Sequence, residues 1–130
     1  MLFYEAREIL FRGKNADTGQ WIEGYFGQSV DSFIIQDYGL VAGHFQVFKV
    51  IPETVGQYTG LTDKNGRKIF EHDHLKDSNG FIYEVYFDGG CFMIKHGLRS
   101  NTFATTHQTL EVIGNIYDNP DLLEVKRDGN

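Results

Sequence analysis

The sequence predicts an all-β protein, and three features of it support that prediction. Aromatic residues make up 15% of the chain, and Gly occurs 15 times against 2 Pro, a composition that suits strands and tight turns better than helices. Stretches in which polar and apolar residues alternate are separated by clusters of Gly, Asn and Asp, as in strands joined by hairpins. A helical signal occurs only near the C-terminus. With 130 residues the chain can bury a core without a disulfide or a metal, and we expect two small β subdomains, residues 1–54 and 55–130.

The first subdomain is expected to contain four strands. Residues 7–12 and 20–27 alternate on either side of residues 13–19, a segment dense in turn residues, which indicates a hairpin. Residues 32–36 and 45–51 are rich in Phe, Ile and Val and flank a loop, so we expect the third and fourth strands there.

Tight-turn signals give the order of the second subdomain. Pro52 opens a short turn, and the Asn-Gly pairs at 65–66 and 79–80 and the Asp-Gly-Gly at 88–90 are typical of turns between paired strands. The strands expected around these turns are residues 55–61, a segment around Leu75, residues 81–87 and residues 91–95.

The C-terminal part combines a loop, a strand and a helix signal. Residues 97–108 are polar and rich in Thr, which predicts a long loop, and residues 110–117 are the last expected strand. Asn119 is a good N-cap and Pro120 suits the first helical position, so a short helix is expected over residues 119–124.

Charge and cysteine content disfavour several classes of function. The formal net charge is −6, with four basic and seven acidic side chains in residues 1–54 and eight and eleven in residues 55–130. Repulsion therefore disfavours nucleic acid and anionic membranes as partners. Cys91 is the only Cys, which excludes an intrachain disulfide and a Cys-rich zinc site. Glu5 and Glu8 interrupt the apolar N-terminus, so no signal peptide is expected, and no apolar run approaches the ~20 residues of a membrane helix. A soluble cytoplasmic protein is expected.

Three segments at the start, middle and end of the chain form a joint pattern. They are REILFRGKNADTGQWIEGY (7–25), PETVGQYTGLTDKNGRKIFEHD (52–73) and VIGNIYDNPDLL (112–123). In this order and spacing they resemble the YopX family of phage and prophage proteins. The resemblance implies an all-β protein whose C-terminal part, residues 55–130, is an SH3-like barrel with a terminal helix, encoded by a phage or prophage and present in a bacterial cell. It implies no established activity, cofactor or catalytic residue.

The chain departs from the family pattern after its Asn-Gly turn. The pattern ends its middle block with Glu-Gly-Asp, whereas this chain has Glu71, His72 and Asp73. His74 follows where an aliphatic strand residue is usual. The resemblance therefore does not require a pair of His side chains here.

His72 and His74 are the candidate metal ligands. In an extended strand, residues two apart point to the same face, and a metal needs at least three convergent ligands. The third would have to be His44, His96 or His107. We favour the alternative, a polar strand after a hairpin in which His74 is half-buried and hydrogen-bonded, and we predict no metal ligand.

Two further catalytic arrangements were considered and disfavoured. Cys91 with His96 has the residue types of a nucleophile and a base, but its apolar neighbours indicate a small buried residue that enters a strand. Glu71 and Asp73 have the residue types of an acid–base pair, but no apolar pocket is evident that would separate their pKa values. Asp73 is instead expected to accept hydrogen bonds from backbone N–H groups at the turn.

Two surfaces are candidates for binding. Lys64, Arg67 and Lys68 surround the Asn-Gly turn, with Tyr58 and Phe70 near in sequence, as in surfaces that stack nucleic-acid bases. The surrounding carboxylates favour a solvated hairpin instead.

Aromatic residues point to a different kind of contact. Trp21, Tyr25 and Phe26 are of the types enriched at protein interfaces, and exposed strand edges favour self-association. The sequence therefore predicts a phage-encoded, non-catalytic protein-binding module that forms homo-oligomers, without cofactor. The alternatives are nucleic-acid binding through an SH3-like module and, least favoured, a metal-dependent enzyme that uses His72 and His74.

Overall fold

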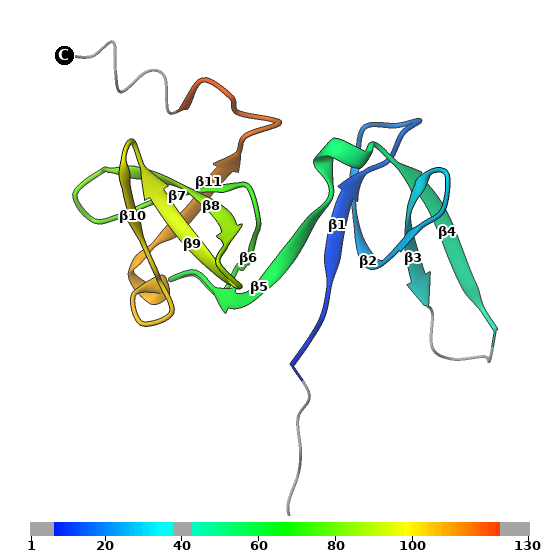
Figure 1. The fold of residues 1–130 in the computed structure, drawn as a ribbon, viewed down its shortest axis with the longest axis horizontal. Helices are drawn as coiled ribbons and strands as arrows, with labels where there is room; N and C mark the ends of the chain where they lie inside the picture. The colour runs from blue at the N-terminus through cyan, green and yellow to red at the C-terminus, as the bar shows by residue number, and fades with distance from the viewer. Residues whose placement is uncertain (1–6, 38–42, 123–130) are drawn as a thin grey trace, which may run out of the picture. The chain divides into compact units, whose positions relative to one another are not determined.

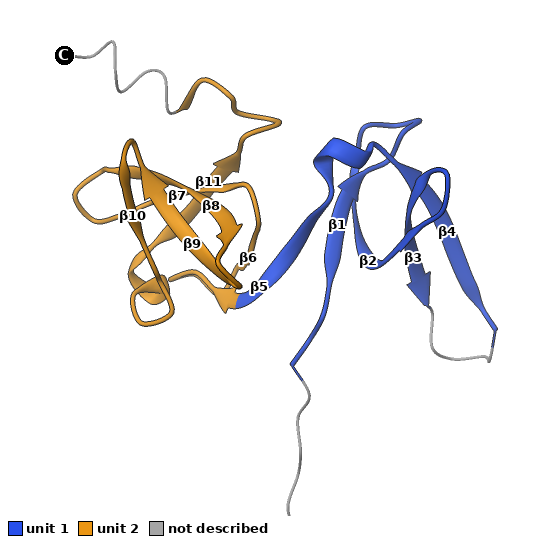
Figure 2. Ribbon diagram, in the orientation of Figure 1, with its two compact units in different colours: residues 1–60 blue, residues 61–130 orange. Residues whose placement is uncertain are grey.

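The chain divides into two compact units, which are described separately (Figure 2). The structure is a computed structural model that describes residues 7–37 and 43–122. Unit 1 comprises residues 1–60 and unit 2 residues 61–130. Residues 55–60 thus group with unit 1, whereas the predicted subdomain boundary lies after residue 54; the domain organisation itself stays a prediction.

Unit 1 contains the strands β4-β3-β2-β1-β5 of a six-stranded sheet (Figure 1), whose last strand, β6, pairs with β5 and belongs to unit 2. Its elements are β1 (Phe11–Lys14), β2 (Trp21–Gln28), β3 (Ser32–Asp37), β4 (Phe45–Val50), the 3₁₀ turn η1 (Pro52–Thr54) and β5 (Gly56–Thr62), which continues into unit 2. The prediction of four strands and a Pro52 turn is confirmed, but the first strand starts later than residue 7.

Side chains close the turns of unit 1. Asn15 accepts hydrogen bonds from the backbone N–H groups of Asp17 (2.8 Å) and Thr18 (3.3 Å), a turn in which Asn replaces backbone acceptors. The Thr54 hydroxyl accepts from the Lys14 N–H (2.9 Å) and donates to the Ile51 carbonyl (2.6 Å). These bonds fix η1 against the end of β1.

Unit 2 is a second antiparallel sheet with the order β10-β9-β8-β7-β11. Its elements are β6 (Lys68–Phe70), β7 (Asp73–Lys76), β8 (Ile82–Asp88), β9 (Cys91–His96), β10 (Arg99–Asn101), the 3₁₀ turn η2 (His107–Thr109) and β11 (Glu111–Asn115). The last strand returns to pair with β7, with Val112 opposite Leu75. The sheet is open in the described residues, so closure into a barrel is not observed.

The two units differ in how much apolar surface they bury. Of the buried hydrophobic residues in the described part of the chain, three lie in unit 1: Ile34, Val50 and Tyr58. Nine lie in unit 2: Ile69, Phe70, Leu75, Ile82, Val85, Ile94, Phe103, Leu110 and Val112. Unit 2 therefore has a developed core, whereas that of unit 1 is small.

The predicted all-β fold is confirmed, and one local prediction requires correction. Residues 97–108 are not a continuous loop, because Arg99 pairs with His96 to form β10 and η2 follows. At the start of the predicted helix, residues 120 and 121 form a turn and Leu122 is helical, and the Leu122 N–H donates to the Asn119 carbonyl (3.3 Å). Residues 123 and 124 of that helix lie outside the described residues. None of the helical segments described has the length and apolar character needed to cross a membrane.

Candidate functional site

One face of the unit 1 sheet is exposed and apolar. Tyr25 lies opposite Ile35, and Ile35 lies opposite Val47, so the three side chains form a row across β2, β3 and β4. Directly opposed residues share a face of the sheet. Tyr25 is 59% exposed, Val47 47% and Phe45, which lies opposite Asp37, 58%. A sheet normally covers an apolar face with another element.

Two open pockets adjoin on this surface and share Tyr25, Ile35 and Asp37. The larger, of about 660 Å³, extends from these residues across Glu23 and Gly24 to residues 7–10. The smaller, of about 320 Å³, extends to Gly43, His44 and Phe45. We call the two together the unit 1 groove. Its length across neighbouring strands suits an extended ligand better than a compact one.

The backbone of β2 and β3 comes unusually close beside the groove. A Cβ atom at Gly24 would collide with the carbonyl oxygen of Ile35 and would lie 3.0 Å from Cγ2 of Ile34. Gly24 is therefore required for this approach. The side chain of Gln36 secures it further, because its Nε2 donates to the Glu23 carbonyl (2.9 Å).

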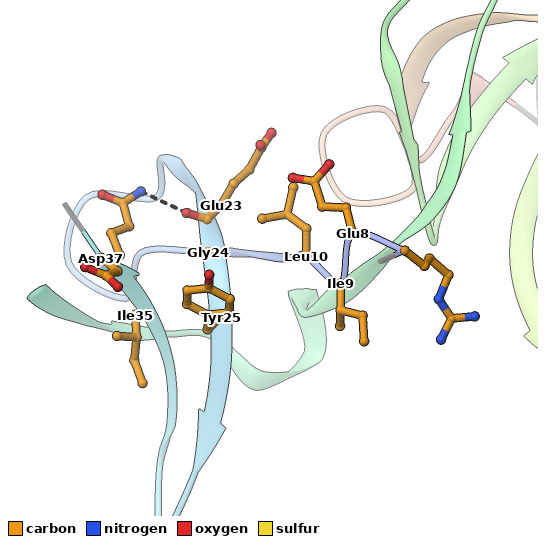
Figure 3. Close-up of a pocket in the computed structure, with 10 residues that line it drawn as sticks. Glu8, Ile9, Leu10, Glu23, Gly24, Tyr25, Ile35 and Asp37 are labelled. Atoms are coloured by element: carbon orange, nitrogen blue, oxygen red, sulfur yellow. Dashed lines mark hydrogen bonds between the residues drawn. The ribbon is translucent and has the colours of Figure 1, made fainter. Parts of the chain in front are cut away.

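The rim of the groove is acidic. Glu8, Glu23 and Asp37 line the larger pocket and are exposed, against one cation, Arg7. In Figure 3 the side chains of Glu8, Leu10 and Glu23 project to the same side of the chain. The groove thus combines an apolar floor with a surplus of negative charge.

His72 does not belong to a strand. It lies in the turn before β7 with a φ of +75°, in the left-handed region that favours Gly. The expectation that His72 and His74 share a strand face is therefore wrong, since that periodicity starts only at Asp73. The His72 imidazole lies 3.7 Å from Oε2 of Glu84. This approach lowers the pKa of Glu84, although burial acts in the opposite direction.

His74 is fully buried rather than half-buried, and it is hydrogen-bonded as predicted. Its Nε2 lies 3.2 Å from the Asn119 carbonyl. A carbonyl only accepts, so Nε2 carries the proton, and the buried Nδ1 has no hydrogen-bond partner. Burial lowers the pKa of His74, with the Asn119 carbonyl, Glu84 and Asp73 acting against it. The imidazole is a neutral structural group.

The candidate third ligands are engaged elsewhere or lie in unit 1. Nδ1 of His96 lies 2.8 Å from the Ile82 carbonyl, and Nδ1 of His107 is hydrogen-bonded to the Thr62 carbonyl. His44 lines the smaller pocket of unit 1. Across residues 7–37 and 43–122, no three His, Cys, Asp or Glu side chains are grouped so that they could hold a metal ion. A metal-dependent enzyme at His72 and His74 lacks a ligand set in this part of the chain.

Cys91 is exposed at the start of β9, so the expectation of a buried thiol is wrong. The residue follows the turn at 88–90 and lies opposite Asp88, at the end of the sheet where little packs over it. Its Sγ lies 3.6 Å from the Asp88 carbonyl. His96, five residues along the same strand, falls on the other face by strand periodicity. The two do not form a nucleophile–base pair.

Asp73 has the role that the sequence predicts. It is buried, and its Oδ2 accepts a hydrogen bond from the Phe70 N–H (2.8 Å). Glu71 points elsewhere, with its Oε2 3.8 Å from Nε2 of His72. The two carboxylates therefore serve a turn and a neighbouring imidazole.

The basic turn lacks exposed aromatic partners. Lys64 and Arg67 are exposed, and Nζ of Lys64 lies 3.8 Å from Oε1 of Glu111. Tyr58 is only 8% exposed and Phe70 2%. Neither ring is available to stack on a base, so the stacking surface expected for nucleic-acid binding is not formed by these residues.

The three aromatic residues singled out in the first subdomain separate in the structure. Trp21 lies beneath the Arg12 guanidinium (4.4 Å to the ring centroid), and Phe26 packs on Phe11 (5.4 Å between centroids). Tyr25 remains exposed in the groove. Sequence reasoning missed Glu8, Glu23 and Asp37 as its neighbours, because they come from three separate segments; the alternation of 20–27 is the signal that places Glu23 and Tyr25 on one face.

Comparisons with known proteins place this fold. The crystal structure of protein EF1440 from Enterococcus faecalis is similar with a TM-score of 0.55 and 23% sequence identity, over 91% of this chain and 99% of that chain. At this identity the likeness shows a shared fold. No curated protein matches the chain. A family model described as "YopX protein" matches residues 10–124, and the chain therefore belongs to the YopX family.

Proposed function

We propose that this YopX-family chain is a non-catalytic protein-binding module and that the unit 1 groove is its contact surface. The observation that carries the proposal is the row of Tyr25, Ile35 and Val47, in which Tyr25 and Val47 are exposed, on a unit with a small core. Contiguous exposed apolar surface on a small domain is typical of an interaction site.

The residues of the groove also support contact with protein. Tyr25 offers a large apolar ring with a polar end at little cost in conformational entropy, which is why Tyr dominates many protein interfaces. The candidate nucleophile and acid–base pairs, by contrast, have structural partners, and this supports a non-catalytic role.

The family assignment supports further parts of the proposal. We propose that the chain is encoded by a phage or prophage, acts in the cytoplasm of a bacterial cell and forms homo-oligomers. In unit 1, β4 is the end strand of the sheet order, and such an edge offers unpaired backbone groups to a second copy. Sedimentation equilibrium tests the last point, and a monomer at all concentrations would contradict it.

Unit 2 is proposed to be SH3-like. Four strands in meander order, β7 to β10, followed by a 3₁₀ turn directly before a last strand that pairs with β7, support this. An experimental structure tests it by showing whether the sheet curls into a partly closed barrel or remains an open layer.

The test of protein binding is capture from bacterial lysate with and without nuclease. The tagged chain is compared with Tyr25→Ala and with Phe87→Ala, a matched control at an aromatic residue of unit 2 that is 52% exposed. We expect one protein in near-stoichiometric yield after nuclease, lost with Tyr25→Ala and kept with Phe87→Ala.

Two outcomes argue against this function. If the Tyr25→Ala variant still captures the protein, the groove is not the contact surface. Capture that disappears with nuclease and weakens steeply with salt favours nucleic-acid binding, since phosphate contacts release counterions; Lys64 and Arg67 would then be the cations to test.

A further inference from the structure

The charge of the unit 1 groove restricts the chemistry of its occupant. Three exposed carboxylates, those of Glu8, Glu23 and Asp37, line the larger pocket together with one cation, Arg7. Exposed charges act over about 8 Å at physiological salt, so carboxylates around one pocket act on the same ligand group. A phosphate or an acidic peptide is repelled there, whereas a cation is attracted.

The floor of the groove favours an occupant that also carries apolar groups. Ile9 is 51% exposed and Tyr25 59%, and Leu10 and Ile35 complete the lining. Small cations gain nothing from such a floor, and the described residues hold no cluster suited to a metal ion. The lining calls for aliphatic side chains next to a cationic one.

We propose that the groove binds an extended protein segment in which Lys or Arg alternates with aliphatic residues, an inference that rests on the proposed protein-binding function. The aliphatic side chains lie over Ile35, Tyr25 and Ile9. The cationic group lies between the Glu8 and Glu23 carboxylates. Arg suits this position better than Lys, because its planar guanidinium pairs bidentately with a carboxylate.

The geometry of the two pockets favours an extended segment in which the two types of residue alternate. Successive side chains of an extended chain point to opposite sides, so alternation presents one kind of residue to the floor and the other to the rim. The two pockets extend across β2 and β3 on either side of Tyr25, Ile35 and Asp37, which accommodates several residues of such a chain.

The experiment is a fluorescence anisotropy titration of the full chain with a labelled peptide, Gly-Leu-Arg-Leu-Lys-Leu-Gly. Matched peptides carry Gln or Glu at both cationic positions. The protein variants are Glu23→Gln, Glu8→Gln and Tyr25→Ala, with Asp17→Asn in the exposed turn of the same unit as the control for loss of one carboxylate. Thermal unfolding of each variant verifies that it is folded.

We expect the cationic peptide to bind and the Glu peptide not to bind. Each Glu→Gln variant is expected to weaken binding by about two- to five-fold, the range of an exposed ion pair, and Tyr25→Ala by about ten-fold or more. Asp17→Asn leaves the affinity unchanged. Equal binding of the cationic and Gln peptides, or equal affinity of Glu23→Gln, Glu8→Gln and wild type, would overturn the proposal.

Two results separate this inference from the proposed function. If lysate capture depends on Tyr25 but no cationic peptide binds, the cationic segment is wrong and protein binding stands. If Tyr25→Ala converts an oligomer of the chain alone to a monomer in sedimentation equilibrium, the occupant is a second copy, and the proposal of a separate cationic segment is overturned.

Discussion

His72 and His74 are two residues apart and differ completely in their physical roles. His72 adopts a left-handed backbone conformation with a φ of +75°, and its ring makes an edge contact with Tyr117 at 5.6 Å. His74 is a buried strand residue whose Nε2 is hydrogen-bonded to the Asn119 carbonyl. Strain at one residue and burial at the other lead to separate predictions.

Replacing His72 by Gly tests the strain. A left-handed conformation costs a non-Gly residue about 1–2 kcal/mol, so His72→Gly is expected to be about 1 kcal/mol more stable than His72→Ala, which keeps the strain and loses the ring contacts. Urea unfolding of both variants and of wild type measures the difference. A Gly variant less stable than the Ala variant contradicts the left-handed conformation.

Protonation of His74 is predicted to destabilise the fold. Its pKa is lowered by burial, so the folded state binds a proton less readily than the unfolded state, whose His pKa is about 6.5. Stability is therefore complete above that pH and falls as the pH drops below it. The free energy of unfolding, measured between pH 7.5 and 5, is expected to decline in wild type.

The control for this prediction is His74→Leu, an apolar residue of similar size that does not titrate. Its stability is expected to change less between pH 7.5 and 5 than that of wild type. The same slope in both proteins would assign the acid sensitivity to a group other than His74.

At the scale of elements, Asp63 joins two distant segments of unit 2. Its Oδ1 accepts from the N–H groups of Asn65 (2.8 Å) and Arg67 (2.9 Å), and its Oδ2 accepts from Val112 (2.9 Å). The β5–β6 turn is thereby tied to β11. Burial by itself raises the pKa of Asp63, but the three N–H donors and Arg67 outweigh it, and the pKa is lowered.

Asp63→Asn is expected to destabilise the chain by about 1–3 kcal/mol, because an amide cannot accept on both atoms and leaves a buried N–H unpaired. Asp77→Asn is the matched control, since Asp77 bonds the N–H groups of Asn79 and Phe81 in an exposed turn. Its cost is expected to be smaller. Denaturant unfolding at pH 7 measures both.

The pH dependence of Asp63 has a defined direction. A lowered folded-state pKa contributes stability that is complete above the unfolded value of about 3.9 and is lost as the pH falls through the folded value. Wild type is therefore expected to lose stability below pH 4 more steeply than Asp63→Asn. Parallel curves would contradict this role of the carboxylate.

Local turn chemistry explains which elements the sequence could predict. The Asn-Gly turns at 65–66 and 79–80 require a positive φ, and Gly66 and Gly80 supply it, so the sequence places β5, β7 and β8 correctly. β6 and β10 were missed because each has three residues, too few for a period to show. Strands this short form because a neighbouring strand pairs with them, as β9 pairs with β10.

Burial at single residues was less predictable than the elements. Tyr58 and Phe70 are near the basic turn in sequence, which suggests a shared surface. In the structure both rings are buried. The neighbours of Cys91 in the sequence predict a buried residue, but Cys91 is exposed. In each case the neighbours that decide burial are distant in sequence, and the same holds for the carboxylates of the groove.

At the scale of the whole molecule, apolar surface is distributed unevenly between the units. Among the buried hydrophobic residues in the described part of the chain, nine lie in unit 2 and three lie in unit 1. Both units expose large hydrophobic residues, unit 1 Ile9, Tyr25, Val30, Phe45 and Val47 and unit 2 Phe81, Phe87 and Leu98. The difference in core size supports the proposal that the core of unit 2 provides stability and that the sheet of unit 1 contacts a partner.

Photo-crosslinking in living cells tests that claim most directly. A benzophenone amino acid replaces Tyr25 in bacterial cells that express the chain, and in a matched control it replaces Phe87. After irradiation, the account predicts a discrete protein adduct from position 25, identified by mass spectrometry, and none at that mass from position 87. An adduct only from position 87, or only nucleic acid attached at position 25, would contradict the account.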